Sequence, residues 1–191
     1  MPLHRRTLML TLVACLTAGS ALAQMTPAQP QVKLRTTLGD IVVQLETAKA
    51  PVTVKNFLQY VKDKHYDGTV FHRVIGNFMI QGGGMTASLQ EKPTRAPIPL
   101  EANNGLKNVR YSIAMARKPD PNSATAQFFI NVNDNTNLDA PRPDGHGYAV
   151  FGQVVQGQEV VDKIRAVPTG RRGMYDDVPL SPVKIISATL L

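Results

Sequence analysis

Apolar residues recur along most of the chain in short runs, as is typical of β-strands. The segment VKLRTTLGDIVVQLE, residues 32–46, contains two such runs broken at Leu38-Gly39-Asp40, which predicts a hairpin. A second hairpin is predicted where TVFHRVI and FMIQGG are separated by Gly76-Asn77. Four further strands are predicted in SIAMA (112–116), AQFFINV (126–132), YAVFGQVV (148–155) and VKIISATLL (183–191).

Two segments follow the helical period instead. In residues 50–66 the spacing i, i+3, i+4, i+7 marks one helical face, made of Val54, Phe57, Leu58 and Val61. Pro51 suits the first turn of this helix. GQEVVDKIRAV, residues 157–167, predicts a second, shorter helix. Because the strands come in runs and do not alternate with helices, we expect a mainly β fold, a closed eight-stranded antiparallel β-barrel capped by two α-helices.

The N-terminal segment has a different character. MPLHRR is basic, TLMLTLVACLTAG is apolar, and ALAQ places Ala21 and Ala23 in a cleavage pattern. Residues 1–23 therefore predict a secretory signal peptide cut after Ala23, residues 24–31 a short linker, and 32–191 a single domain exported to the periplasm. A short membrane anchor and lipidation at Cys15 are the alternatives, but the apolar run is too short for a stable membrane span.

Composition narrows the functional classes. The formal net charge of the full chain is +7, and its basic residues are scattered without interleaved aromatics, so we expect no nucleic-acid partner. Once Cys15 is removed the mature chain has no cysteine and must be stabilised by a buried core. With three remaining histidines (65, 72 and 146) and no metal-binding motif, no metal site is expected. The triplet Gly82–Gly84 lacks the continuation of a phosphate loop.

Strand alternation assigns side chains to faces. Residues two apart share a face, which pairs Met79 with Gln81, Phe78 with Ile80, Gln127 with Phe129, and Phe128 with Ile130. A face that mixes large apolar groups with amides suits an apolar ligand that has a hydrogen-bonding backbone. Ordinary half-exposed sheet positions are the alternative.

Arg73 is the charged residue of the preceding strand. Alternation places it opposite His72 and on the side of Phe71 and Ile75. An arginine among such neighbours needs a partner or a ligand, because an unpaired buried charge is costly. The alternative is a rim arginine whose stem covers apolar surface. His72 is interpreted as a hydrogen-bonding residue of the structure more than as a catalyst.

Four blocks together resemble the cyclophilin-type peptidyl-prolyl cis-trans isomerases, particularly those of the bacterial periplasm. They are FHRVIGNFMIQGG, IAMAR, SATAQFFINV and YAVFGQVVQG, and the resemblance runs from Val32 to Leu191. It implies a barrel with two helices, an isomerase that needs no cofactor, and proline-containing segments of unfolded or exported proteins as partners. It also implies a monomer that assists the folding of exported proteins.

The resemblance also implies a set of site residues. Arg73 and Gln81 match catalytic positions of the family. The implied substrate-binding residues are His72, Phe78, Met79, Ala116, Gln127, Phe129, Leu138 and Tyr148.

Three positions depart from the common family pattern. Asn137 stands where an aromatic residue is frequent, which argues against high affinity for cyclosporin. Tyr148 replaces a pocket histidine, and Arg117 replaces an asparagine. These changes leave open a second hypothesis, a non-catalytic module that binds proline-containing peptides. A metal-dependent hydrolase is a third and weaker hypothesis.

Overall fold

The computed structural model of the chain describes residues 29–191. The predicted signal peptide, its cleavage after Ala23, Cys15 and most of the predicted linker lie outside this range. The elements, in chain order, are β1 (Gln31–Thr36), β2 (Gly39–Leu45), α1 (Pro51–Lys62), β3 (Phe71–Ile75), β4 (Met79–Gly82), β5 (Ser112–Met115), β6 (Phe128–Asn131), the short 3-10 helix η1 (Thr136–Leu138), β7 (Val150–Gln156), α2 (Gln158–Arg165), β8 (Thr169–Arg172), β9 (Tyr175–Pro179) and β10 (Ile185–Leu190).

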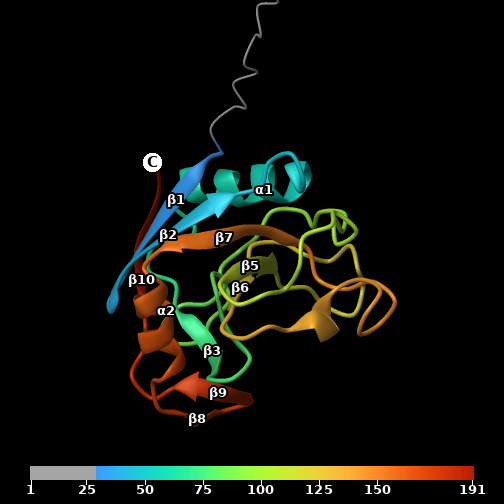
Figure 1. The fold of residues 1–191 in the computed structure, drawn as a ribbon. Coiled ribbons are helices and arrows are strands. Elements are labelled where there is room, and N and C mark those ends of the chain that lie inside the picture. The colour runs from blue at the N-terminus through green and yellow to red at the C-terminus, as the bar shows by residue number, and fades with distance from the viewer. Residues whose placement is uncertain (1–28) are drawn as a thin grey trace, which may run out of the picture.

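Eight antiparallel strands form one strongly curled sheet, in the order β10-β1-β2-β7-β5-β6-β4-β3 (Figure 1). All eight strands predicted from the hydrophobic pattern are present, and the two predicted hairpins are β1–β2 and β3–β4. The two predicted helices are α1 and α2, and Pro51 is the first residue of α1. Within residues 29–191 neither helix is long and apolar enough to cross a bilayer.

The prediction of a closed barrel is wrong, because the sheet is open between its edge strands β3 and β10. A single bridge, Val70 to Lys184, joins the segments that precede these two strands. The amide of Phe71 donates to the Val183 carbonyl at 2.9 Å beside this bridge. Pro182, which has no N–H and a fixed φ, comes next, and the chain there leads away to another hairpin.

The main core fills the concave side of the sheet and is closed by the two helices. Val54, Phe57 and Val61 of α1 are 1%, 0% and 6% exposed, and Leu58, the fourth residue of the predicted helical face, is half-buried at the edge of the core. Val161 and Ile164 of α2 are fully buried in the same cluster. In Figure 1 α1 lies across one end of the curled sheet, and α2 packs against β2, β3 and β4. Because this core uses the concave face of the sheet, the convex face can carry a site.

A hairpin that the sequence pattern did not predict, β8–β9, extends from the molecule beside β3 (Figure 1). No element was predicted for residues 169–179, because TGRRGMYDDVP is polar and has no apolar alternation. Most of its side chains are exposed or half-buried. Strands that bury little leave no hydrophobic period. Cross-strand pairing and contact with β3 hold this hairpin in place.

Candidate active site

A row of directly opposed residues crosses four strands on the convex face of the sheet. Arg73 of β3 pairs with Gln81 of β4, and Gln81 pairs in turn with Phe129 of β6. Phe129 also pairs with Ala114 of β5. Directly opposed residues of a sheet point to the same face. An arginine, an amide and a phenyl ring therefore lie side by side, away from the main core.

A cavity of about 260 Å³ lies along this row. Its apolar floor includes Met79, Phe129 and Leu138, which are 2%, 4% and 6% exposed and form a cluster separate from the main core. The residues that line the cavity are Arg73, Phe78, Met79, Gln81, Ala116, Arg117, Phe129, Leu138 and Tyr148. Every predicted site residue except His72 and Gln127 is thus brought to one cavity, and Arg117 joins them.

A β-bulge in β3 directs Arg73 to the cavity. Phe71 is opposite Gly82, whereas Arg73 is opposite Gln81, so His72 is one extra residue in this strand. The bulge interrupts the alternation, and Phe71 and His72 are both buried. The prediction that Arg73 shares a face with Phe71 is therefore wrong, while Ile75 packs at the cavity cluster on the side of Arg73, as predicted.

His72 itself does not line the cavity. The bulge leaves it 6% exposed within the molecule, and its Nδ1 has no hydrogen-bond partner among residues 29–191. Burial lowers the pKa of His72 from 6.5 to about 4, against a smaller opposing effect of a hydrogen bond with the Val70 backbone. His72 is therefore a neutral, buried side chain near neutral pH, and it acts on the site through the shape of β3.

Phe78 also departs from the predicted alternation. It precedes β4 and lies in the turn after β3, so it does not share the face of Ile80, which belongs to the main core. Its backbone carbonyl accepts hydrogen bonds from the Val132 amide at 3.1 Å and from Asn135 Nδ2 at 2.7 Å. These bonds fix the turn, which leaves the Phe78 ring beside the floor of the cavity.

The two predicted glutamines contact each other. Gln81 Nε2 donates to Gln127 Oε1 at 2.9 Å, next to a smaller cavity of about 100 Å³ that both residues line. Gly84 makes room for this pair, because a Cβ at position 84 would overlap the Gln127 side chain. Gly83, the residue before it, has φ +85°, a backbone conformation that favours glycine, and packs against the Phe128 ring.

Arg73 has a partner that the sequence pattern did not indicate. Its side chain is 45% exposed, and its Nε lies 3.7 Å from Oδ2 of Asp177 on β9. Asp177 has φ 59° and follows an irregularity in the β8–β9 pairing, which aims its carboxylate toward β3. The only sequence signal for this contact was the acidic pair in YDDV, which lies in a polar hairpin that the pattern did not predict.

Two of the three departures from the family pattern lie in the cavity wall. Tyr148 meets the Phe129 ring edge to face, with centroids 5.7 Å apart and an angle of 78°. The guanidinium of Arg117 lies over the Tyr148 ring, 4.6 Å from the ring centroid. Asn137, by contrast, is exposed and is not part of the lining.

A larger groove of about 850 Å³ lies elsewhere, between α1 and β10. Aliphatic residues and surface lysines line it, and it contains neither Arg73 nor the two glutamines. Among residues 29–191, no three side chains of His, Cys, Asp or Glu gather as a metal site. The chemically equipped site is therefore the cavity of about 260 Å³, which offers two arginines, the Gln81 amide and an apolar floor.

Fold and site together define the class of protein that the sequence motifs predicted. The family model of cyclophilin type peptidyl-prolyl cis-trans isomerases matches residues 31–190. The chain belongs to this family and is an enzyme of that class.

Several bacterial relatives are similar over nearly their full length. The peptidyl-prolyl cis-trans isomerase cyp18 of Streptomyces antibioticus is 58% identical over 162 residues, which cover 84% of this chain and 98% of that protein. A peptidyl-prolyl cis-trans isomerase of Acinetobacter baylyi is 53% identical over 182 residues, 95% of this chain and 96% of that protein. Peptidyl-prolyl cis-trans isomerase B of Escherichia coli is 54% identical over 161 residues, 83% of this chain and 98% of that protein.

Solved structures share the fold. A cyclophilin-type isomerase of Cryptosporidium parvum superposes with a TM-score of 0.71 at 25% identity, covering 85% of this chain and 98% of that one. The same protein, solved in the presence of the dipeptide Ala-Pro, gives a TM-score of 0.70 at 25% identity, covering 84% of this chain and 98% of that one.

Proposed function

We propose that this chain accelerates rotation about X-Pro peptide bonds in the cavity of the convex face, and that it assists the folding of exported proteins. The observation that carries the proposal is the position of Arg73 on the wall of an apolar cavity whose floor is Met79, Phe129 and Leu138. The related structure solved with Ala-Pro supports a proline-containing ligand.

The chemistry requires no nucleophile. A peptide bond resists rotation by about 18–20 kcal/mol, because resonance gives its C–N bond partial double-bond character. When the bond twists, resonance is lost and the proline nitrogen regains a lone pair. An arginine N–H that donates to this nitrogen stabilises the twisted state more than the planar one. Only such a differential interaction lowers the barrier.

The remaining residues divide the other tasks. Phe78, Met79, Phe129 and Leu138 hold the proline ring while the carbonyl side of the bond rotates. Gln81, opposed to Arg73 across the strand pair and bonded to Gln127, offers an amide to the substrate backbone. Every one of these groups acts by position and hydrogen bonding, so the reaction as proposed uses neither metal nor cofactor.

The direct test is the isomerisation rate of an Ala-Pro peptide with purified residues 24–191, measured by exchange NMR. We expect isomerisation to be clearly faster than the uncatalysed reaction, which takes tens to hundreds of seconds for X-Pro bonds. EDTA is expected to leave the acceleration unchanged. Peptide binding without acceleration would instead establish the non-catalytic module, and a loss of activity in EDTA would point to a metal enzyme.

The proposed role in folding has its own test. A protein whose slow refolding phase arises from a non-native X-Pro isomer should refold faster when catalytic amounts of this chain are added. If the slow phase keeps its rate while the peptide assay is positive, the assistance to folding is excluded and the isomerase activity stands.

The proposed periplasmic location rests on the sequence of residues 1–23. Cell fractionation and intact mass measurement test it, and the expected mature protein is soluble and begins at Gln24. A mature N-terminus at a lipidated Cys15 would show a membrane-anchored protein instead.

A further inference from the structure

Arg117 is a buried cation at the boundary between two cavities. It follows Ala116 directly after β5 and lines both the cavity of the convex face and the smaller cavity beside Gln81 and Gln127. Its side chain is only 2% exposed. A buried charge is costly unless it is paired and hydrogen-bonded. The contacts that compensate Arg117 therefore show what this residue holds together.

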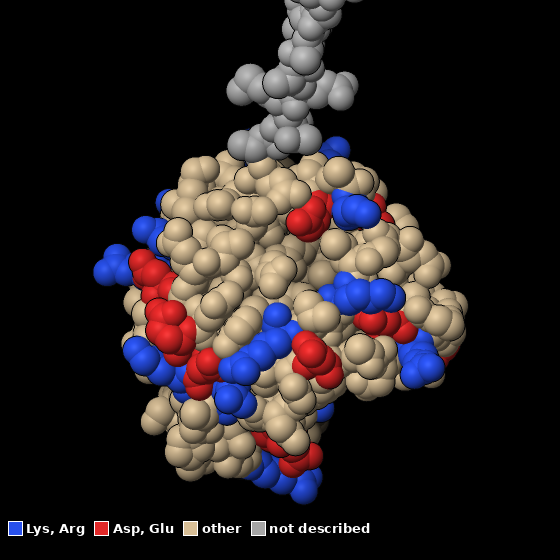
Figure 2. Space-filling model, viewed as in Figure 1, with Lys and Arg blue, Asp and Glu red and all other residues tan. Residues whose placement is uncertain are grey.

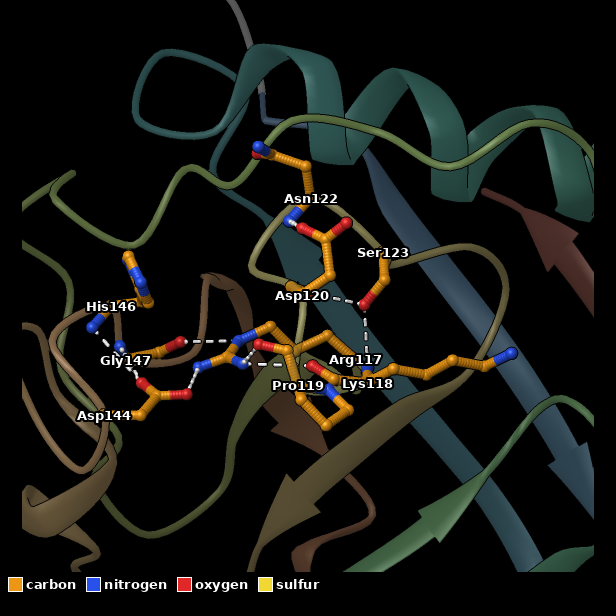
Figure 3. Close-up of polar contacts among 9 residues, drawn as sticks. All are labelled: Arg117, Lys118, Pro119, Asp120, Asn122, Ser123, Asp144, His146 and Gly147. Carbon is orange, nitrogen blue, oxygen red and sulfur yellow. Dashed lines mark hydrogen bonds and ion pairs between the residues drawn. The ribbon is translucent and has the colours of Figure 1, made fainter.

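The guanidinium joins two loops that are distant in sequence (Figure 3). On one side, Nε donates to the Gly147 carbonyl at 3.0 Å and one terminal nitrogen donates to Asp144 Oδ2 at 2.6 Å. On the other side, the second terminal nitrogen donates to the carbonyls of Lys118 at 3.1 Å and Pro119 at 3.4 Å. One side chain thus ties the segment after β5 to the loop before Tyr148.

Each of these loops is also organised internally. Oδ1 of Asp144 accepts from the amides of His146 at 3.2 Å and Gly147 at 3.3 Å, so the carboxylate serves its own loop with one oxygen and Arg117 with the other. The hydrogen bond from Arg117 lowers the pKa of Asp144 below its ordinary value of 3.8, which keeps the carboxylate charged near neutral pH. In the other loop, the Lys118 amide donates to Ser123 Oγ at 2.8 Å.

The same guanidinium reaches the cavity through an aromatic ring. It lies 4.6 Å above the centroid of Tyr148, and Tyr148 in turn meets Phe129 edge to face at 5.7 Å. A desolvated guanidinium over a ring is strongly favourable, and its planar face restricts the ring's orientation. A continuous series of contacts therefore leads from Asp144 through Arg117 and Tyr148 to the floor of the cavity.

We propose that Arg117 is a positioning residue that fixes Tyr148 as a wall of the cavity and so sets the affinity for the proline-containing substrate. This inference rests on the proposed isomerase function. Tyr148 packs on Phe129 of the floor, which holds the proline ring, so we expect its wall to serve the planar and the twisted substrate equally. Such uniform binding changes KM and leaves kcat nearly constant.

The test is a double-mutant cycle of Arg117→Gln and Tyr148→Ala, with Kd, KM and kcat measured for an Ala-Pro peptide by titration and exchange NMR. We expect Arg117→Gln to raise Kd and KM about tenfold, with kcat changed less than about threefold. If Arg117 acts through Tyr148, adding Arg117→Gln to Tyr148→Ala gives little further increase.

Arg110 provides a matched control. Its guanidinium lies 4.7 Å from the Tyr111 centroid and pairs with Asp162 at 2.9 Å, so it makes the same two kinds of contact at a more exposed position, 43% exposed, away from the cavity. Arg110→Gln is expected to leave KM and kcat unchanged. Thermal unfolding checks that each variant is folded, and Arg117→Lys, which keeps the charge but loses the planar stacking and the fork of donors, replaces Arg117→Gln if the latter does not fold.

The outcomes separate this inference from the proposed function. An inactive wild-type chain overturns the isomerase proposal itself. If the wild type is active, two results overturn only the positioning role of Arg117. In one, the effects of the two substitutions on KM add fully. In the other, Arg117→Gln and Arg117→Lys lower kcat with KM unchanged. A rise in KM that disappears in the Tyr148→Ala background establishes it.

Discussion

At the scale of single residues, the site depends on side chains whose positions are fixed by their neighbours. Arg73 is half-exposed, and the contact that constrains it is the ion pair with Asp177. At Asp177 the β9 backbone adopts φ 59°, a conformation that is uncommon for a residue other than glycine. Such backbone outliers often lie at functional sites. Asp177 is therefore expected to limit the orientations of Arg73 before substrate binds.

Replacing Asp177 by Asn should lower kcat/KM by about two- to fivefold, because exposed ion pairs contribute at most about 1 kcal/mol. Steady-state measurement on an Ala-Pro peptide checks this. Asp176→Asn is the matched control, since Asp176 is the adjacent acid, is 71% exposed and pairs with Arg171 instead. Equal activity of Asp177→Asn would show that the ion pair does not position Arg73, and higher activity would show that it holds Arg73 away from its working position.

At the scale of elements, the long loop 85–108 stabilises the N-terminus of α1. The helix begins at Pro51 without a side-chain cap of its own and has no acidic residue in its first turn. Glu101 supplies both functions from the loop: its carboxylate accepts from the amides of Val52 at 3.1 Å and Thr53 at 2.8 Å. A carboxylate at a helix N-terminus satisfies free N–H groups and complements the helix dipole.

Glu101→Gln should therefore lower the free energy of unfolding by about 1 kcal/mol, as does the loss of other N-terminal caps. Urea unfolding of the variant and of wild type measures the difference. Glu91→Gln is the control, because Glu91 lies in the same loop and is exposed. A variant as stable as wild type would mean that water replaces the Glu101 contact without cost.

The buried His72, at the bulge of β3, leads to a second prediction at this scale, which concerns the pH dependence of stability. Its pKa is about 4 in the folded chain, whereas a histidine of ordinary pKa, 6.5, is expected once the chain unfolds, so the unfolded chain binds more protons between these values. Stability should then be full above about pH 6.5 and fall as pH decreases toward 4, by up to about 3 kcal/mol from this residue.

Urea unfolding from pH 7 to 4.5 tests this, and the variant His72→Gln should show a smaller loss of stability over the interval. His146→Gln, at an exposed position, should keep the wild-type slope. If His72→Gln retains the full pH dependence, groups other than His72 cause it.

At the scale of the whole molecule, one continuous core on the concave side supports a site on the convex side. The site draws on segments far apart in the sequence: the β3–β4 hairpin, β6, the loop before Tyr148 and the β8–β9 hairpin. Acidic and basic residues are intermingled on the face shown in Figure 2 and do not form one basic patch. Recognition is therefore assigned to the shape of the cavity and its few polar groups.

The hydrophobic pattern alone predicted most of the sheet and the face of Phe129, because β4 and β6 alternate regularly between the core and the cavity. It could not predict the bulge at His72, which adds a residue without changing the apolar run. It missed Asp177, whose hairpin buries too little to leave a period. It also predicted a closed barrel, whereas the sheet is open between β3 and β10.

The central claim is that Arg73 stabilises the twisted bond and contributes little to holding the planar peptide. Exchange NMR on an Ala-Pro peptide measures kcat and Kd together for wild type, Arg73→Ala and the control Arg35→Ala, an exposed arginine of β1. We predict that Arg73→Ala loses about a hundredfold to a thousandfold in kcat, with Kd nearly unchanged, and that Arg35→Ala behaves as wild type. A variant Arg73→Ala that keeps the wild-type kcat, or that loses affinity alone, would contradict this account.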